Sequence, residues 1–195
     1  MNSVLDIEKN TVVDGAISFC ETQGLEIVFT YEISRADLQM ISERTKNLPA
    51  MYHASVGMLL GRLKNGCFLI MKDGVIYGHI FAHRHTIENH SVYERSSLWV
   101  HKQYRNNNLG LLLMDCLTKK FSKEFLISIA QDATVHHNNE LLGMQFITLK
   151  DLSPVLIETL EKLGKLRDEY KYKYYVNPYF ESKINQFNKI LKNKI

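Results

Sequence analysis

The chain has 195 residues, of which 45% are hydrophobic, which is the size and apolar content of one globular domain. Its formal net charge of +3 is small, and residues 181–195, with four lysines and one glutamate, account for all of it. The near-neutral remainder argues against a nucleic-acid-binding surface across the domain.

The cysteines and the apolar runs indicate where the chain works. Cys20, Cys67 and Cys116 are far apart and lie beside apolar residues. Their odd number and lack of metal-ligand spacing predict reduced core thiols. No apolar run reaches the length of a membrane span, and early acidic residues stand where a signal peptide would have an apolar core. We therefore expect a cytoplasmic protein with no membrane span.

The first third of the chain predicts three helices and one strand. An amphipathic pattern over residues 10–22 predicts a short N-terminal helix. The alternating, β-branched and aromatic run Leu25–Tyr31 predicts a strand. Ser34 precedes a periodic apolar run and is expected to cap a helix, and a further helix is expected over 52–63.

The middle of the chain predicts a hairpin followed by a strand–helix–strand unit. Asp73-Gly74 lies between two apolar runs, and this dipeptide favours a tight turn between strands covering 67–83. A strand is then expected over 95–100, a helix with one apolar face over 109–121, and a strand over 125–130. Towards the end, a helix over 153–163 and a tyrosine-rich strand over 171–176 complete the order.

The turn between the strand over 95–100 and its following helix carries the strongest functional signal. It reads Tyr104-Arg-Asn-Asn-Asn-Leu-Gly110. A helix that begins here presents unpaired backbone N–H groups and the positive end of its dipole, which together suit a phosphate or pyrophosphate. Arg105 adds a cation, Lys102 a second one, and Gly110 leaves room for a ligand to approach the backbone. The turn therefore predicts a diphosphate-binding site of a nucleotide-type cofactor.

These residues resemble the acyl-CoA pyrophosphate motif of the GNAT superfamily of N-acyltransferases, Arg/Gln-x-x-Gly-x-Gly/Ala. Tyr104-Arg105 and Gly110 fit it, and Asn108 replaces the first glycine. Asparagine is the non-glycine residue that best tolerates a left-handed backbone, so the replacement is mild. The resemblance is specific over residues 98–117, while the order of predicted elements agrees with it elsewhere. It is neither a Walker loop nor a Rossmann fingerprint.

The resemblance implies an α/β (α+β) GNAT-type fold, a mixed twisted sheet with splayed central parallel strands flanked by helices. It implies acetyl-CoA as acyl donor and no metal. The pantetheine arm is expected to bind the strand backbone at 98–100, and the pyrophosphate the turn at 105–111, with Asn139 touching the pantetheine or a water. The expected donor-binding residues are Leu98, Trp99, Val100, Arg105, Asn106, Asn107, Asn108, Leu109, Gly110, Leu111 and Asn139.

The attacking amine must be neutral, so the reaction needs a base or a water chain leading to one. The family often uses a glutamate near the central strands, and Glu94, just before the strand predicted at 95–100, occupies that position, with Glu88 as a weaker candidate. His83 and His85 share a strand face with His79 and are the alternative proton relay. The same histidines could bind a metal, but no carboxylate or cysteine accompanies them in the sequence, so no metal is expected.

The general acid is the part of the pattern that the sequence lacks. In the family a tyrosine on the helix after the second splayed strand protonates the leaving thiolate. Here Leu160 or Asn139 stands in its place, depending on the alignment. The acid is then another group, water, or one of the tyrosines of the last strand, Tyr170, Tyr172, Tyr174 and Tyr175. The polar stretch after residue 130, with Asp132 and Thr134, is expected to be a loop on the acceptor side.

Two readings compete with an acetyl-CoA-dependent enzyme. One is an N-acyl synthase of the same fold that uses an acyl carrier protein or a long-chain acyl-CoA. The other is a CoA-binding regulatory or interaction module without turnover. The acceptor is expected to be a primary amine of a small molecule or peptide, and a homodimer is left open.

The predicted organisation is one GNAT-like domain over 1–179, with an extra N-terminal helix, and a basic amphipathic helix over 180–195. The apolar face of that terminal helix carries Phe180, Ile184, Phe187 and Leu191. We expect it to pack on its own domain or on a partner subunit, so that removing the chain after Tyr179 lowers the melting temperature or changes the oligomeric state.

Overall fold

The computed structural model describes residues 4–46, 53–87, 90–151, 154–162, 164 and 172–192. Within these residues, seven strands form one mixed sheet in the order β1-β2-β3-β4-β5-β7-β6. The chain divides into two compact units, one made of residues 1–83 and 95–120 and the other of residues 84–94 and 121–195. Strands β3 (Val75–Ile87) and β4 (His90–Val100) contribute residues to both units.

The first unit contains the helices α1 (Val4–Gln23), α2 (Arg35–Thr45), α3 (Val56–Leu63) and α4 (Leu109–Lys120). Its strands are β1 (Glu26–Thr30), β2 (Cys67–Lys72) and parts of β3 and β4, and a short 3-10 helix, η1 (Lys102–Tyr104), precedes α4. β1 and β2 pair antiparallel, as do β2 and β3. The turn between β2 and β3 has positive φ at both Asp73 (48°) and Gly74 (76°), which confirms the predicted hairpin.

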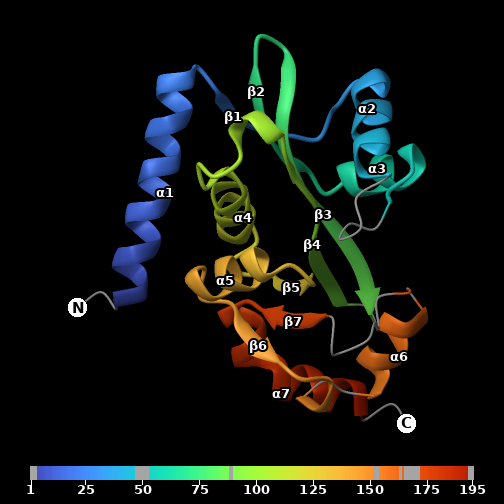
Figure 1. The fold of residues 1–195 in the computed structure, drawn as a ribbon. Coiled ribbons are helices and arrows are strands. Elements are labelled where there is room, and N and C mark those ends of the chain that lie inside the picture. Colours follow the sequence, from blue (N-terminus) through green and yellow to red (C-terminus); the bar gives the residue numbers. More distant parts are fainter. Residues whose placement is uncertain are drawn as a thin grey trace. The chain divides into compact units, whose positions relative to one another are not determined.

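Alternation along β2 and β3 divides the side chains of the first unit between two packing layers. Leu69 and Phe81 pack with apolar residues of α2 and α3 in one buried cluster. On the other face, a Cβ placed on Gly78 would lie 3.3 Å from Ile70 and from Leu113 of α4, so a side chain there would press on both residues. α1 and α4 lie side by side (Figure 1). The expected cap of α2 is present, since Ser34 accepts a hydrogen bond from the Asp37 N–H.

The second unit contains β5 (Phe125–Ala130), β6 (Gln145–Ile147) and β7 (Lys173–Val176), with the helices α5 (Ala133–Leu141), α6 (Pro154–Lys162) and α7 (Pro178–Lys192). A 3-10 turn, η2 (Leu149–Asp151), lies between β6 and α6. β4 and β5 pair parallel, whereas β7 pairs antiparallel with both β5 and β6. The sheet is therefore mixed, as expected.

The second unit is closed by a cluster of buried side chains around the start of α7. Phe180 is 0% exposed and packs with Val92, Ile127 and Tyr174, and Ile184 packs against the same cluster. Asn177 is buried just before it, and its side-chain oxygen accepts hydrogen bonds from the N–H groups of Leu126 and Phe180. Phe187 and Leu191 have side chains outside the described part, so the role of the rest of the terminal helix stays a prediction.

Several predicted boundaries were wrong. α1 begins at Val4 rather than near residue 10, α3 begins at Val56, and β4 begins at His90 rather than at Arg95. The polar stretch after β5, expected to be a loop, is the helix α5, in which the Asp132 carboxylate accepts hydrogen bonds from the N–H groups of Thr134 and Val135. The three-residue strand β6 was also missed, because so short a run shows no alternation.

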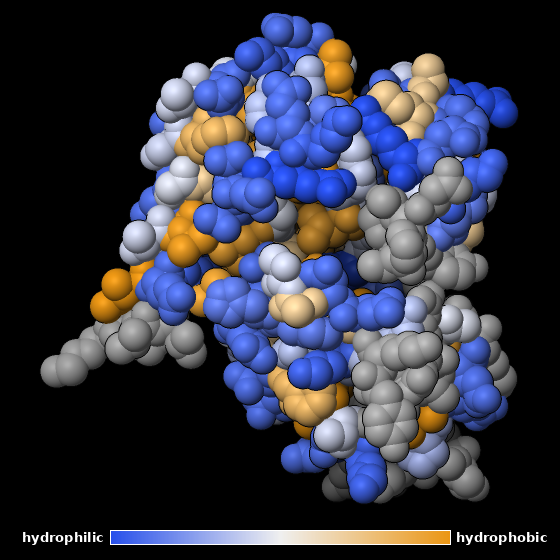
Figure 2. Space-filling view, in the orientation of Figure 1, coloured by the Kyte–Doolittle hydropathy of each residue, from blue (hydrophilic) through white to orange (hydrophobic). Residues whose placement is uncertain are grey.

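The three cysteines are free thiols. Cys20 and Cys67 are buried, as predicted, whereas Cys116 is only partly buried, and burial raises the pKa of Cys67 to about 12. Within the described ranges no helix combines the length and the apolar character that crossing a bilayer demands. The surface of the view in Figure 2 is largely hydrophilic, with exposed hydrophobic side chains on α1, among them Ile7 and Ile17.

Candidate active site

The turn before α4 has the backbone that its sequence predicts. Asn106 and Asn108 both have positive φ, 65° and 56°. The Asn107 amide donates hydrogen bonds to the carbonyls of Tyr104 (3.3 Å) and Arg105 (3.0 Å) and so fixes the turn from inside. Asn108 thus adopts the left-handed conformation expected of the residue that replaces glycine.

The first turn of α4 offers unpaired backbone donors. The first helical bond runs from the Leu112 N–H to the Asn108 carbonyl at 3.0 Å, so the N–H groups of Leu109, Gly110 and Leu111 have no intrahelical acceptor. A Cβ on Gly110 would meet only Leu98, at 4.0 Å, so neither φ nor packing requires glycine there. A Cβ at Gly110 would have no close neighbour, and the positive end of the helix dipole lies at this turn.

Arg105 connects this turn to the end of β4. Its side chain is exposed, and its Nε donates to the Val100 carbonyl at 3.1 Å. The next residue, His101, donates its backbone N–H to Tyr77 of β3 at 2.7 Å. Because successive strand residues point their polar groups to opposite edges, the polar groups of Val100 lie on the edge of β4 away from β3.

The parallel pairing of β4 with β5 is short. It runs from Val92 with Phe125 to Glu94 with Ile127, and within the described residues it stops there although β4 continues to Val100. The edge of β4 at Leu98 and Val100 therefore has no partner strand in this ladder. Amide groups of a ligand can use such an edge as a missing strand would.

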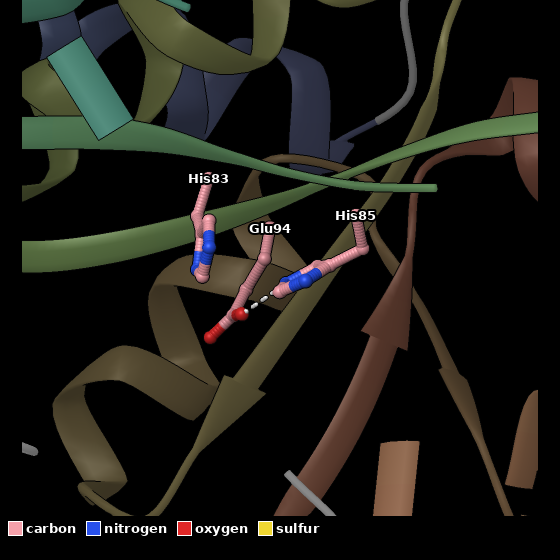
Figure 3. A group of neighbouring side chains, drawn as sticks. All are labelled: His83, His85 and Glu94. Carbon is pink, nitrogen blue, oxygen red and sulfur yellow. Dashed lines mark hydrogen bonds and ion pairs between the residues drawn. The ribbon is translucent and has the colours of Figure 1, made fainter. Parts of the chain in front are cut away.

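Glu94 lies inside β4, whereas its sequence position predicted that it stands just before the strand. Its side chain is buried, with the residue 5% exposed, so it is not a solvated loop carboxylate. The Nε2 of His85, also 5% exposed, lies 2.8 Å from a Glu94 carboxylate oxygen. Figure 3 shows the His85 ring directed at this carboxylate. The structure thus brings together all three predicted catalytic residues: His85 and Glu94 form a buried pair, and a nitrogen of His83 lies within 4.8 Å of the other two groups, a spacing that could also hold a metal ion.

His83 is on the face of β3 that carries His85, two residues earlier, and is partly exposed (Figure 3). His79, which the sequence groups with them, is instead engaged with Ser97 of β4. A carboxylate does accompany His85, contrary to the ground on which a metal was set aside from the sequence, so the absence of a metal stays a prediction. Glu88, the weaker candidate base, lies outside the described residues.

Ser97 is an unusual residue for a strand interior, because its φ is 52°. A left-handed backbone costs a non-glycine residue about 1–2 kcal/mol and persists only where its surroundings enforce it. Two side chains do so. The Arg62 guanidinium donates to the Ser97 hydroxyl at 2.6 Å, and the His79 Nδ1 lies 2.7 Å from the Ser97 carbonyl. No sequence signal marks this position, since Ser96-Ser97 reads as ordinary strand.

Trp99, predicted to bind the acyl donor, has its side chain in the first unit. Its ring is stacked on His79, with centroids 5.6 Å apart and an interplanar angle of 15°. The Arg44 guanidinium lies over the ring at 4.4 Å from its centroid. The role of Trp99 in donor binding stays a prediction.

The second unit holds Asn139, which stands at the missing acid position in one alignment, and Tyr175, one of the tyrosines predicted as alternative acids. Asn139 of α5 is 0% exposed, so its amide is part of the interior of this unit. Tyr175 of β7 is also buried. Burial, with the nearby Glu140 carboxylate to which the phenol hydrogen-bonds, raises the pKa of Tyr175. This phenol keeps its proton at neutral pH, as a general acid requires.

The burial of His79 predicts a loss of stability in acid. Burial lowers the pKa of His79 to about 4, the Ser97 carbonyl opposes that change, and the Arg44 charge adds to it. Between pH 6.5 and 4 the unfolded chain binds a proton that the folded chain does not, so the free energy of unfolding falls as pH falls. At pH 5 the loss is about 2 kcal/mol.

Urea unfolding at pH 7 and pH 5 checks this expectation. His79→Gln should flatten the difference between the two pH values, and His53→Gln, at an exposed histidine, should leave it as in the wild type. An equal slope in the wild type and His79→Gln would show that another group carries the acid sensitivity.

Comparison with solved structures identifies the fold. N-acetylglutamate synthase from Neisseria gonorrhoeae, complexed with coenzyme A and N-acetyl-glutamate, superposes with a TM-score of 0.58 at 15% identity. The chain has the GNAT acetyltransferase fold. The superposition covers 78% of the present chain but only 35% of that synthase. No protein-family model and no curated protein sequence matches the present chain.

Two further GNAT-fold structures match over nearly their whole length. Rv2747 from Mycobacterium tuberculosis, in complex with CoA, has a TM-score of 0.54 at 11% identity and covers 77% of this chain and 98% of its own. Naa50 from Arabidopsis thaliana, bound to a bisubstrate analogue of CoA and a peptide, has 0.52 at 14%, with 77% and 96% covered. The expected fold class is confirmed.

Proposed function

We propose that this chain is an acyl-CoA-dependent N-acyltransferase that transfers an acetyl group from acetyl-CoA to a primary amine. The observation that carries the proposal is the start of α4. Open N–H groups, a left-handed Asn108 and an unfilled space over Gly110 occur together in a fold whose solved examples hold CoA or acetyl-CoA.

In this proposal the donor uses two features of the first unit. The N–H groups at 109–111 bind the pyrophosphate, and the exposed Arg105 supplies a positive charge beside it. The open edge of β4 at Leu98 and Val100 hydrogen-bonds the amides of the pantetheine arm. The Arg105 side chain donates to the Val100 carbonyl, so Arg105 links the turn before α4 to the open edge of β4.

The buried pair Glu94–His85 supplies the base. The neutral amine attacks the thioester carbonyl, the new C–N bond forms, and the C–S bond breaks as the tetrahedral intermediate collapses. One amine proton passes to the Glu94 carboxylate, directly or through water, and the CoA thiolate takes a proton from an acid. His85 holds the carboxylate in place through its 2.8 Å contact. We assign this acid to water or to another group.

The acceptor stays at the level of its chemistry. The neighbours carry N-acetyl-glutamate in one case and a peptide-like bisubstrate analogue in another. A small-molecule or peptide amine is therefore the proposed acceptor here. The cytoplasmic location, the homodimer and the absence of nucleic-acid partners stay predictions.

Calorimetric titration of acetyl-CoA tests the donor site. Gly110→Glu should weaken binding by at least about 100-fold, since it puts a bulky anion where the pyrophosphate approaches. Gly61→Glu is the matched control, because that helical glycine also has open space at its Cβ but lies in α3. Gly110→Ala should weaken binding less, while its unfolding midpoint does not fall, since alanine favours a helix by about 0.5–1 kcal/mol over glycine. If Gly110→Glu binds as tightly as Gly61→Glu, the assignment of the donor site to this turn is wrong.

A separate assay distinguishes an enzyme from a non-catalytic module. Binding of acetyl-CoA without CoA release across a panel of amines would favour the non-catalytic module.

A further inference from the structure

The strained residue Ser97 directly precedes the segment that we propose binds the acyl donor. A φ of 52° turns the backbone at Ser97 away from the extended conformation of a strand. The direction of the Leu98 N–H, and of the edge that continues to Val100, depends on this turn. Strain of this kind is retained where neighbouring groups enforce it, and it gathers at functional sites.

Two buried donors from different elements converge on Ser97. Arg62, at the end of α3, is 2% exposed and reaches the hydroxyl, while His79, in β3, is 0% exposed and reaches the carbonyl. The arginine contact is charge-assisted and short, at 2.6 Å. If Ser97 returned to an extended conformation, both contacts would be lost inside the unit, where an unsatisfied polar group is costly.

The neighbouring residues make the His79 ring rigid. The ring stacks on Trp99 and lies edge-on to Phe81, with centroids 5.6 Å and 5.7 Å away. Ser96 adds another contact with β3, as its hydroxyl donates to the Phe81 carbonyl at 3.2 Å. The turn at Ser97 is therefore held on both sides by groups that cannot easily move.

We infer that Arg62 and His79 are positioning residues, which hold Ser97 in its left-handed conformation and thereby aim the backbone of Leu98–Val100 at the acyl donor. This inference rests on the proposed function. Neither side chain touches the reacting atoms in it. Their effect is on turnover through the geometry of the strand, and a misplacement of about 1 Å can cost about 100-fold in rate.

The pair Ser97→Ala and Ser97→Gly tests the inference. Both variants remove the hydroxyl that Arg62 binds, but only glycine adopts positive φ without steric cost. CoA release with a panel of amines should therefore show a kcat for Ser97→Gly at least about 10-fold above that for Ser97→Ala. A merely structural role of the hydroxyl predicts equal kcat values for the two variants, and that result would overturn the inference.

Variants of His79 test the inference in two ways. His79→Leu removes the hydrogen-bond donor to Ser97, whereas His79→Asn keeps a donor and should recover much of the turnover. Urea unfolding adds a measurement that needs no ligand. The urea midpoint should fall less on His79→Leu in the Ser97→Gly background than in the wild type, because glycine does not need the contact. His53→Leu, at an exposed position, controls for the change of residue type.

The outcomes separate this inference from the proposed function. Absence of acetyl-CoA binding by the wild type would refute the function and, with it, the aiming of the donor segment. Binding and turnover by the wild type, with additive midpoints for His79→Leu and Ser97→Gly, would refute the inference alone. Coupled midpoints together with a kcat difference between the two Ser97 variants support it.

Discussion

Glu94→Gln should lower kcat by about 10²–10⁴-fold and leave the affinity for acetyl-CoA nearly unchanged, since general base catalysis contributes that much. The substitution keeps the shape of the side chain, and the glutamine oxygen can still accept a hydrogen bond from His85. It removes only the ability to take a proton. Glu94 is 5% exposed, so the substitution changes a buried group and not a solvated carboxylate.

The experiment follows CoA release across pH and compares Glu94→Gln with Glu124→Gln, at an exposed carboxylate. The acid side of the wild-type pH profile should disappear only in Glu94→Gln. The rate should be insensitive to EDTA, in keeping with the predicted absence of a metal. An unchanged profile would remove Glu94 from the mechanism and direct attention to His83 and His85.

Loss of activity on adding EDTA, with recovery on adding a divalent ion, would contradict the base assignment in another way. It would indicate that the carboxylate and the imidazole bind a metal, because a 2.8 Å hydrogen bond between such groups is also compatible with two ligands brought together. His85→Gln distinguishes the two cases. It should reduce the rate partially if His85 only orients Glu94, and should abolish the response to metal if it is a ligand.

Phe180→Ala should lower the free energy of unfolding by about 3–5 kcal/mol, the cost of deleting a fully buried phenylalanine. The ring is 0% exposed, lies 5.0 Å from the ring of Phe125, and closes the cluster formed by Val92, Ile127 and Tyr174. The α7 backbone begins there too, where the Asn177 side chain caps the Phe180 N–H at 3.1 Å.

Thermal unfolding of Phe180→Ala and Glu181→Ala checks this expectation. The second variant changes an exposed neighbour on the same helix and should stay within about 0.5 kcal/mol of the wild type. For a chain of this size the first should melt about 6–20 °C lower. Equal melting temperatures would mean that the start of α7 does not anchor the helix, and the terminal segment would then be no part of the fold.

Local chemistry explains the parts of this protein that its sequence predicted well. Asp73-Gly74 forms its turn because both residues accept positive φ, and Asn108 takes the left-handed conformation before α4 for the same reason. The strand over 125–130 was predicted at its observed bounds, since a short apolar run between polar residues is typical of a buried strand. The turn that we propose binds the diphosphate depends on neighbours in sequence, so the sequence alone could indicate it.

Helix α5 was missed because its sequence has little apolar periodicity. Two asparagines and two histidines occupy its middle, and these residue types read as a polar loop. Its one local signal was the capping residue Asp132, which accepts from two N–H groups of the first turn. Packing against β5 and β6 stabilises the helix, and that contact joins segments apart in sequence.

The sequence by itself predicted the type of fold, which is confirmed, and it indicated the proposed donor-binding turn and the candidate base, because each is set by residue types at short spacing. The tertiary structure decided what those residues can do. It placed Glu94 inside β4, in contact with His85 nine residues away, so that the carboxylate is buried and paired with an imidazole. It also bent β4 at Ser97 by bringing Arg62 and His79 to it from 35 and 18 residues away. Such contacts depend on strand pairing and helix packing, which no local pattern encodes.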